Sequence, residues 1–149
     1  TNGHVSIIRR SLKLFDTVVV LVTRNPSKRP LFTSEERMAM VGQCFTDEPR
    51  LEVAALDGLL AHYAAERQAT ALIRGLRGPS DFEYELQMAH MNRHLAEGLE
   101  TVFLAAEAKG SYVSSSLVRE VAQLGGDVST LVPKPVRDAL VNRLPGDTE

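Results

Sequence analysis

The run TVVVLVT, residues 17–23, decides the fold class of this 149-residue chain. Its β-branched side chains favour a strand, and the lack of alternation between apolar and polar residues indicates burial on both faces. Strands of that kind belong to parallel sheets that helices cover. No purely apolar stretch is longer than the one from Val18 to Val22, which is far below the roughly 18 residues that suggest a membrane span, so no membrane partner is expected.

Helices and strands alternate outward from this run. Before it, apolar residues from Val5 to Phe15 recur at three- and four-residue spacing, which predicts a helix capped by Thr1 or Asn2. Beyond it, we expect strands over residues 51–55, 70–73 and 101–105. We expect helices over residues 33–45, 59–67 and 80–95. Two more helices are expected, one from Ser114 or Ser115 to Gly125 and one after Pro133. Helical crossovers between strands predict a single α/β domain, a Rossmann-like open parallel sheet with helices on both faces.

The composition restricts the class of protein. With 44% hydrophobic and 24% charged residues, the 149-residue chain is typical of one globular domain. The single cysteine, Cys44, excludes an internal disulfide, and we expect a cytoplasmic protein. A net charge of -2 and an aromatic content of only 5% argue against a nucleic-acid-binding module.

Two polar segments are expected where the strands end, which is where open α/β sheets bind ligands. The predicted loop Arg74–Pro79 directly follows a strand, and Ser114–Ser116 open a helix. His4, beside Gly3, lies in the first turn of another helix, where free N–H groups and the helix dipole attract anions. Each segment also has a simpler reading, because serine caps and exposed cap histidines without a ligand are common.

Arg74 and Arg77 are the strongest candidates for phosphate binding, because two guanidinium groups in a glycine-containing loop suit bidentate contacts. Lys28, after the TVVVLVT strand, would add a positive group on the same edge or simply be solvated. Arginine supplies 13 of the 17 basic residues, so coding bias could account for part of the pattern.

Other patterns are not assigned chemistry. Asp81, Glu83 and Glu85 occupy alternate helical positions that point in different directions, so they are interpreted as complementing the helix dipole. His90 and His94 have the spacing of zinc ligands without an evident third ligand, and are interpreted as surface or packing residues. No nucleophile elbow, Walker loop or G-x-G-x-x-G motif is present. The remaining cations, N–H groups and hydroxyls suit phosphoryl or nucleotidyl transfer.

Four segments, in order, carry a family resemblance. They are TNGH (1–4), NPSKRPLFTSEER (25–37), IRGLRGPSDFEYELQMAHMNRHL (73–95) and SYVSSSLVREVA (111–122). Together they resemble the bacterial phosphopantetheine adenylyltransferases of the nucleotidyltransferase superfamily, with RGLR–DFEYE–AHMN as the most specific part. The resemblance implies transfer of AMP from ATP to 4'-phosphopantetheine with Mg²⁺, giving dephospho-coenzyme A and pyrophosphate, the penultimate step of coenzyme A synthesis.

The resemblance also implies roles for individual residues. His4 would stabilise the transition state at the α-phosphate, and Lys28 and Arg74 would act with it and hold the phosphopantetheine side. The further contacts to that substrate would be Leu60, Tyr84 and Asn92. The further ATP contacts would be Gly75, Leu76, Arg77 and Glu85, with Gly110, Ser111, Tyr112, Val113, Ser114, Ser115 and Ser116 around the β- and γ-phosphates.

The chain departs from the family pattern at two places. That pattern begins with a strand and a G-[ST]-F-D-P loop before T-x-G-H, so we expect such a segment to precede Thr1 and the intact mass to exceed 16.4 kDa. Gly110 stands where relatives are often aromatic, so any stacking on adenine would come from elsewhere.

The resemblance further implies a homohexamer, with coenzyme A as an inhibitory ligand. Two other functions stay open at this point. One is a nucleotidyltransferase with another small acceptor, such as nicotinate mononucleotide or glycerol phosphate. The other is a catalytically silent nucleotide-binding protein.

Overall fold

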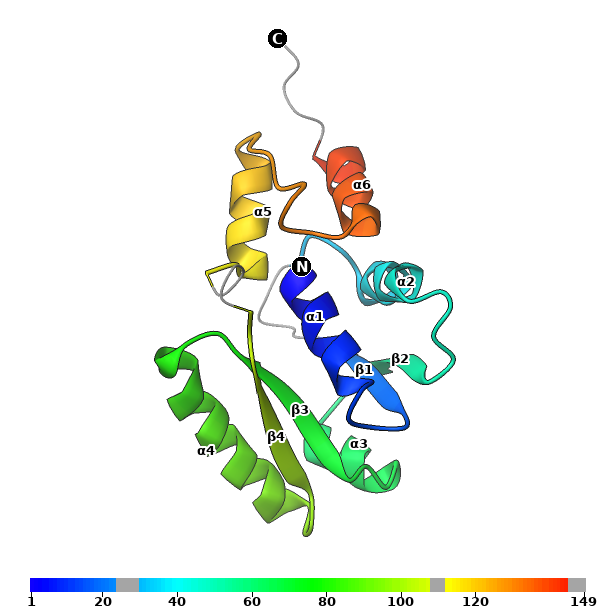
Figure 1. Ribbon diagram of the computed structural model, residues 1–149, viewed down its shortest axis with the longest axis vertical. Helices are drawn as coiled ribbons and strands as arrows, with labels where there is room; N and C mark the ends of the chain where they lie inside the picture. Colours follow the sequence, from blue (N-terminus) through cyan, green and yellow to red (C-terminus); the bar gives the residue numbers. More distant parts are fainter. Residues whose placement is uncertain (24–29, 108–111, 145–149) are drawn as a thin grey trace.

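In the computed structural model, which describes residues 1–23, 30–107 and 112–144, four strands and six helices alternate (Figure 1). The helices are α1 (Asn2–Ser11), α2 (Ser34–Cys44), α3 (Leu60–Glu66), α4 (Pro79–Leu95), α5 (Ser115–Gln123) and α6 (Lys134–Arg143). The strands are β1 (Val18–Thr23), β2 (Leu51–Leu56), β3 (Ala71–Leu76) and β4 (Glu100–Ala105). This order confirms the predicted α/β class.

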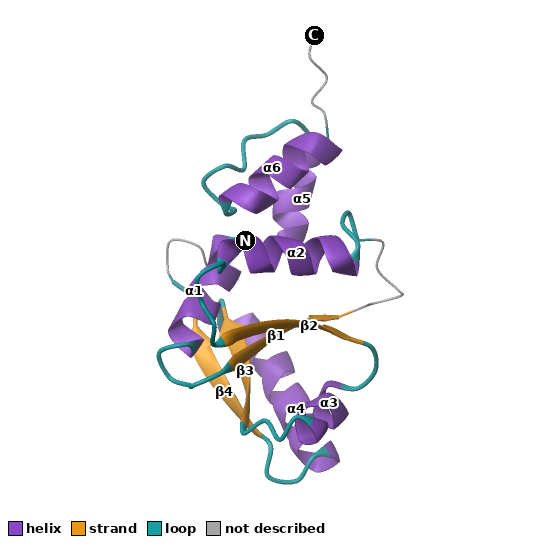
Figure 2. Ribbon diagram, turned by 90° about the vertical axis from the view of Figure 1, so that its right-hand side faces the viewer, coloured by secondary structure: helices purple, strands orange, loops and turns teal. Residues whose placement is uncertain are grey.

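The strands pair in parallel, β1 with β2 and β3 with β4 (Figure 2). Val18 lies opposite Leu51 in the first pair, and Ala71 lies opposite Glu100 in the second. Within the described residues, the four strands therefore form two separate parallel sheets of two strands each. Each pair has its own helical crossover, because α2 connects β1 to β2 and α4 connects β3 to β4.

Helix α1 contacts both sheets, through β1 and β3. In β3, Gly75 lies directly against Ile7, because a Cβ atom added at Gly75 would be 3.1 Å from Ile7 Cγ1. Near the end of α1, Arg10 Nη1 donates a hydrogen bond of 2.5 Å to the carbonyl oxygen of Ala105, the last residue of β4. These contacts fix α1 against the carboxyl end of the β3–β4 sheet.

Buried apolar side chains form two clusters. The first joins α3 and β3 with the end of α4, and contains Ala61, Ala64, Leu72, Ala96 and Leu99. The second joins α5 and α6 with the segment between them, and contains Val113, Val118, Val128, Val132 and Leu140. The second cluster anchors the start of α5 through Val113, one residue before the serine run.

Two predicted boundaries are wrong. Residues 74–76 were expected in a loop but form the last half of β3, because they pair with residues 103–105 of β4. The α4 helix begins at Pro79 with Gly78 as its cap, not at Ser80. Proline is favoured at the first helical position because its φ is preset and its missing N–H would have no helical partner there.

The variant Gly75→Val tests the contact between β3 and α1. Its γ-methyl groups would meet Ile7, so we expect the free energy of unfolding in urea to fall by roughly 1–3 kcal/mol. In the double variant Gly75→Val/Ile7→Ala the loss should be smaller than the sum of the two single losses. Strict additivity would contradict the contact.

Gly42→Ala is the matched control. Gly42 lies within α2, and nothing outside the local helical backbone approaches its added Cβ within 4 Å. Alanine should therefore leave stability unchanged or raise it by up to about 1 kcal/mol, as expected for a helix interior.

Candidate active site

Three polar segments lie on the side of the molecule where β3 and β4 end (Figure 1). Arg77 directly follows β3, and α5 follows β4 in the chain. The first turn of α1 reaches the same side, where the Asn2 backbone N–H donates to the carbonyl of Leu131 at 3.0 Å and its side chain donates to the carbonyl of Thr130 at 2.9 Å. Two helix N-termini thus face the carboxyl ends of two parallel strands, which is the expected ligand edge of such a fold.

His4 lies in the first turn of α1 and is oriented by Thr1. Its Nδ1 is 3.2 Å from the Thr1 backbone nitrogen and 3.0 Å from Thr1 Oγ1. Because that nitrogen can only donate, Nδ1 accepts the bond and the ring proton is assigned to Nε2. The sequence expectation of a histidine donor at a helix N-terminus is therefore matched by a defined tautomer.

The environment of His4 lowers its pKa to about 4. Neighbouring atoms displace water from the ring, and this desolvation is the largest cause, although the residue keeps an exposed surface; the positive charge of Arg77 adds to it. His4 is consequently neutral at physiological pH and offers an N–H donor without a charge.

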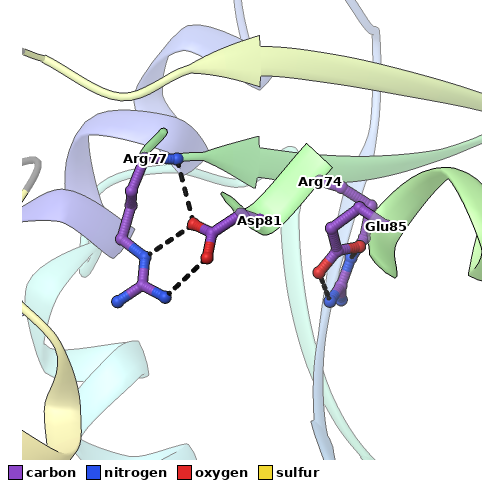
Figure 3. Close-up of polar contacts among 4 residues, drawn as sticks. All are labelled: Arg74, Arg77, Asp81 and Glu85. Carbon is purple, nitrogen blue, oxygen red and sulfur yellow. Dashed lines mark hydrogen bonds and ion pairs between the residues drawn. The ribbon is translucent and has the colours of Figure 1, made fainter. Parts of the chain in front are cut away.

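Both candidate arginines are held by carboxylates of α4 (Figure 3). Arg74 donates from Nε and Nη2 to the two oxygens of Glu85, each at 2.7 Å. Arg77 donates from Nε and Nη2 to the two oxygens of Asp81, at 3.0 and 3.1 Å. The hydrogen bonds that Arg74 donates to Glu85 raise the pKa of Arg74, and those that Asp81 accepts from Arg77 lower the pKa of Asp81.

The acidic residues at the start of α4 were expected only to complement the helix dipole, and this interpretation was incomplete. Asp81 and Glu85 lie four residues apart, share one face of the helix and pair with arginines, whereas Glu83 at the alternate position is exposed. The signal for these pairs in the sequence was the similar spacing of the two sets: the arginines are three positions apart, and the carboxylates are four positions apart. Each pair has no net charge, so the site is less positive than the sequence suggested.

The residues expected on the phosphopantetheine side lie on α3 and α4. Tyr84 is 63% exposed, one residue before Glu85, the carboxylate that holds Arg74. Asn92 is buried about two turns further along α4, and Leu60, the first residue of α3, packs against the first apolar cluster. These residues therefore lie on two elements that contact each other, since α3 packs against α4.

The serine run lies at the start of α5, as predicted. Ser114 caps the helix by accepting the backbone N–H of Leu117 at 3.1 Å, and Ser115 and Ser116 are exposed. Before it, Val113 is buried and Tyr112 is exposed. Three further expected site residues, Lys28, Gly110 and Ser111, lie outside the described residues.

Comparison with known proteins agrees with this geometry. A cytidylyltransferase-like family model matches residues 1–121, which identifies the class as a nucleotidyltransferase. The phosphopantetheine adenylyltransferase of Alkalilimnicola ehrlichii is 51% identical over 148 residues, covering 98% of this chain and 85% of the relative. The chain therefore belongs to the phosphopantetheine adenylyltransferase family, within the cytidylyltransferase-like group, as its motifs indicated.

The lowered pKa of His4 gives a pH test. Since the folded value, about 4, lies below the ordinary 6.5, the neutral ring stabilises the fold. That contribution is present above pH 6.5 and is lost as the pH falls towards 4. We expect the His4 ring resonances to titrate near pH 4 by NMR, and a midpoint near 6.5 would contradict this environment. In His4→Ala, the fall in unfolding free energy between pH 6.5 and 4 should be smaller than in the parent protein.

Proposed function

We propose that this protein transfers AMP from ATP to 4'-phosphopantetheine, producing dephospho-coenzyme A and pyrophosphate in the penultimate step of coenzyme A synthesis. The observation that carries the proposal is the 51% identity to a phosphopantetheine adenylyltransferase over 98% of the chain. The joint placement of His4, Arg74 and Arg77 at the ligand edge supports it.

The proposed reaction is an in-line displacement at the α-phosphorus. A phosphate oxygen of phosphopantetheine forms the new P–O bond, and the bond from the α-phosphorus to the bridging oxygen of the β-phosphate breaks, so pyrophosphate leaves with the electron pair. A phosphate monoester is largely ionised at neutral pH, so the acceptor needs no general base. His4 donates its Nε2–H to an α-phosphate oxygen, where charge builds in the transition state.

The cationic residues align the two anions. Arg74 holds the phosphate of phosphopantetheine, together with Lys28, while Leu60, Tyr84 and Asn92 contact the rest of that substrate. The nucleotide side consists of Gly75, Leu76, Arg77 and Glu85, with residues 110–116 around the β- and γ-phosphates. The two sides meet at the Arg74–Glu85 pair, whose bonds of 2.7 Å join a residue of the phosphopantetheine side to a residue of the nucleotide side.

Mg²⁺ belongs to the proposal as part of the Mg·ATP substrate. Across residues 1–23, 30–107 and 112–144, no group of three or more His, Cys, Asp or Glu could hold a metal ion. Asp81 and Glu85, the carboxylates beside the arginines, are already paired. Mg²⁺ in nucleotide enzymes is commonly held through substrate phosphates with few protein carboxylates, so no residue here is assigned to it.

The proposal includes a single domain that assembles as a cytoplasmic homohexamer, with coenzyme A as an inhibitory ligand. An exposed apolar row along α4, formed by Tyr84, Met88, Met91 and Leu95, supports association with other copies. In the part of the chain that the structure describes, no helix has the length and apolar content needed to cross a membrane.

Pyrophosphate release from Mg·ATP tests the reaction, with 4'-phosphopantetheine, nicotinate mononucleotide and glycerol phosphate as parallel acceptors. We expect release with phosphopantetheine alone. Release with another acceptor would keep the mechanism and overturn the substrate. No release with any acceptor, together with measurable ATP binding, would favour a catalytically silent nucleotide-binding protein.

His4→Ala separates catalysis from binding. The proposed hydrogen bond strengthens in the transition state, so we expect kcat to fall by roughly 10²–10³-fold while the Kd for Mg·ATP changes by less than about 2-fold. His94→Ala, an exposed position on α4, is the control and should leave kcat unchanged. An equal loss of ATP affinity and kcat in His4→Ala would contradict the assigned role.

A further inference from the structure

We infer that Asp81 is a positioning residue that aims the Arg77 guanidinium at the phosphates of the bound nucleotide. This inference rests on the proposed function, in which Arg77 contacts ATP. Asp81 itself touches no substrate in this account. Its effect is exerted through Arg77.

Asp81 fixes Arg77 at both its backbone and its side chain. Oδ2 accepts the Arg77 backbone N–H at 3.2 Å and Nε at 3.0 Å, while Oδ1 accepts Nη2 at 3.1 Å (Figure 3). A free arginine side chain carries about 2 kcal/mol of rotamer entropy. The two bonds from the side chain to this carboxylate remove much of that freedom before a ligand arrives.

The pairing leaves one edge of the guanidinium for an anion. The bonds to Asp81 use Nε and Nη2, and among the described residues Nη1 makes no hydrogen bond. Arginine presents its donors in a rigid planar fork, so holding one edge fixes the direction of the other. The Arg77 side chain remains about 45% exposed, which keeps that free edge accessible.

The position of Arg77 joins this free edge to the rest of the site. Its positive charge is one of the causes that lower the pKa of His4. Arg77 directly follows β3 and is separated from the first residue of α4 only by Gly78. Asp81, three residues after Gly78, is therefore the point at which α4 holds a donor at the end of β3.

A purely structural role for Asp81 is the competing explanation. An acidic residue in the first turn of a helix interacts favourably with the helix dipole, and removing it lowers stability whatever Arg77 does. Stability alone therefore cannot decide between the two roles. The affinity for nucleotide, and its dependence on Arg77, distinguishes a positioning role from a structural one.

The test compares Asp81→Ala, Asp81→Asn, Arg77→Ala and the double variant. We expect Asp81→Ala to raise the KM for ATP and the calorimetric Kd for Mg·ATP by roughly 5–20-fold, with kcat changed by less than about 3-fold. Asp81→Asn keeps one acceptor oxygen and should fall between the parent and Asp81→Ala. The double variant should bind Mg·ATP no more weakly than Arg77→Ala alone, because Asp81 acts through Arg77.

Glu48→Ala is the matched control. Glu48 holds Arg50 by an equivalent set of bonds, from the backbone N–H at 3.2 Å and from Nε and Nη2 at 2.9 Å each. This pair precedes β2 and lies at the opposite edge of its sheet. Glu48→Ala should leave both the KM and the Kd unchanged.

Each outcome decides the inference. Unchanged or tighter Mg·ATP binding in Asp81→Ala, or additive losses in the double variant, would overturn it and leave Asp81 a structural residue. If the parent protein binds Mg·ATP but releases no pyrophosphate with any acceptor, the proposed function is overturned. The Kd values for Mg·ATP then still test whether Asp81 positions Arg77. If the parent protein does not bind Mg·ATP, both are overturned.

Discussion

The close contact between α1 and β3 is the constraint on which the site depends. Because Gly75 has no side chain, Ile7 can lie against the strand, and the helix is fixed with its first turn at the ligand edge. Although 73 positions separate Arg77 from His4 in the sequence, the positive charge of Arg77 is one of the causes that lower the pKa of His4. A bulkier residue at position 75 would meet Ile7 and disturb the placement of α1 against β3.

The electrostatics of the site depend on paired rather than free charges. Arg74 and Arg77 are each neutralised by a carboxylate of α4, and the environment of His4 keeps it neutral. On the proposed function, the site therefore attracts phosphates through oriented N–H donors rather than through a large excess of positive charge. Such donors stabilise a developing charge without reorganising, which suits a reaction between two anionic substrates.

The local elements could be predicted because their signals are local. A capping box of Thr33 and Glu36 starts the helix predicted over residues 33–45, with Thr33 N–H donating to Glu36 at 2.8 Å, and Ser114 caps α5 as expected. The end of β3 could not be predicted, since residues 74–76 become a strand only through pairing with β4, which follows more than 20 residues later. The division of the strands into two sheets and the pairing of Asp81 with Arg77 likewise depend on tertiary contacts.

On the proposed function, the bound nucleotide bridges the start of α1, the end of β3 and the start of α5. The most direct measurement is a titration of the ¹⁵N-labelled protein with Mg·ATP, followed by the backbone amide resonances. Shifts of Gly3, His4, Arg77 and Ser115 along one binding curve are the expected result. Saturable binding that shifts only one of these segments, or shifts residues at the opposite edge near Arg50, would contradict the claim.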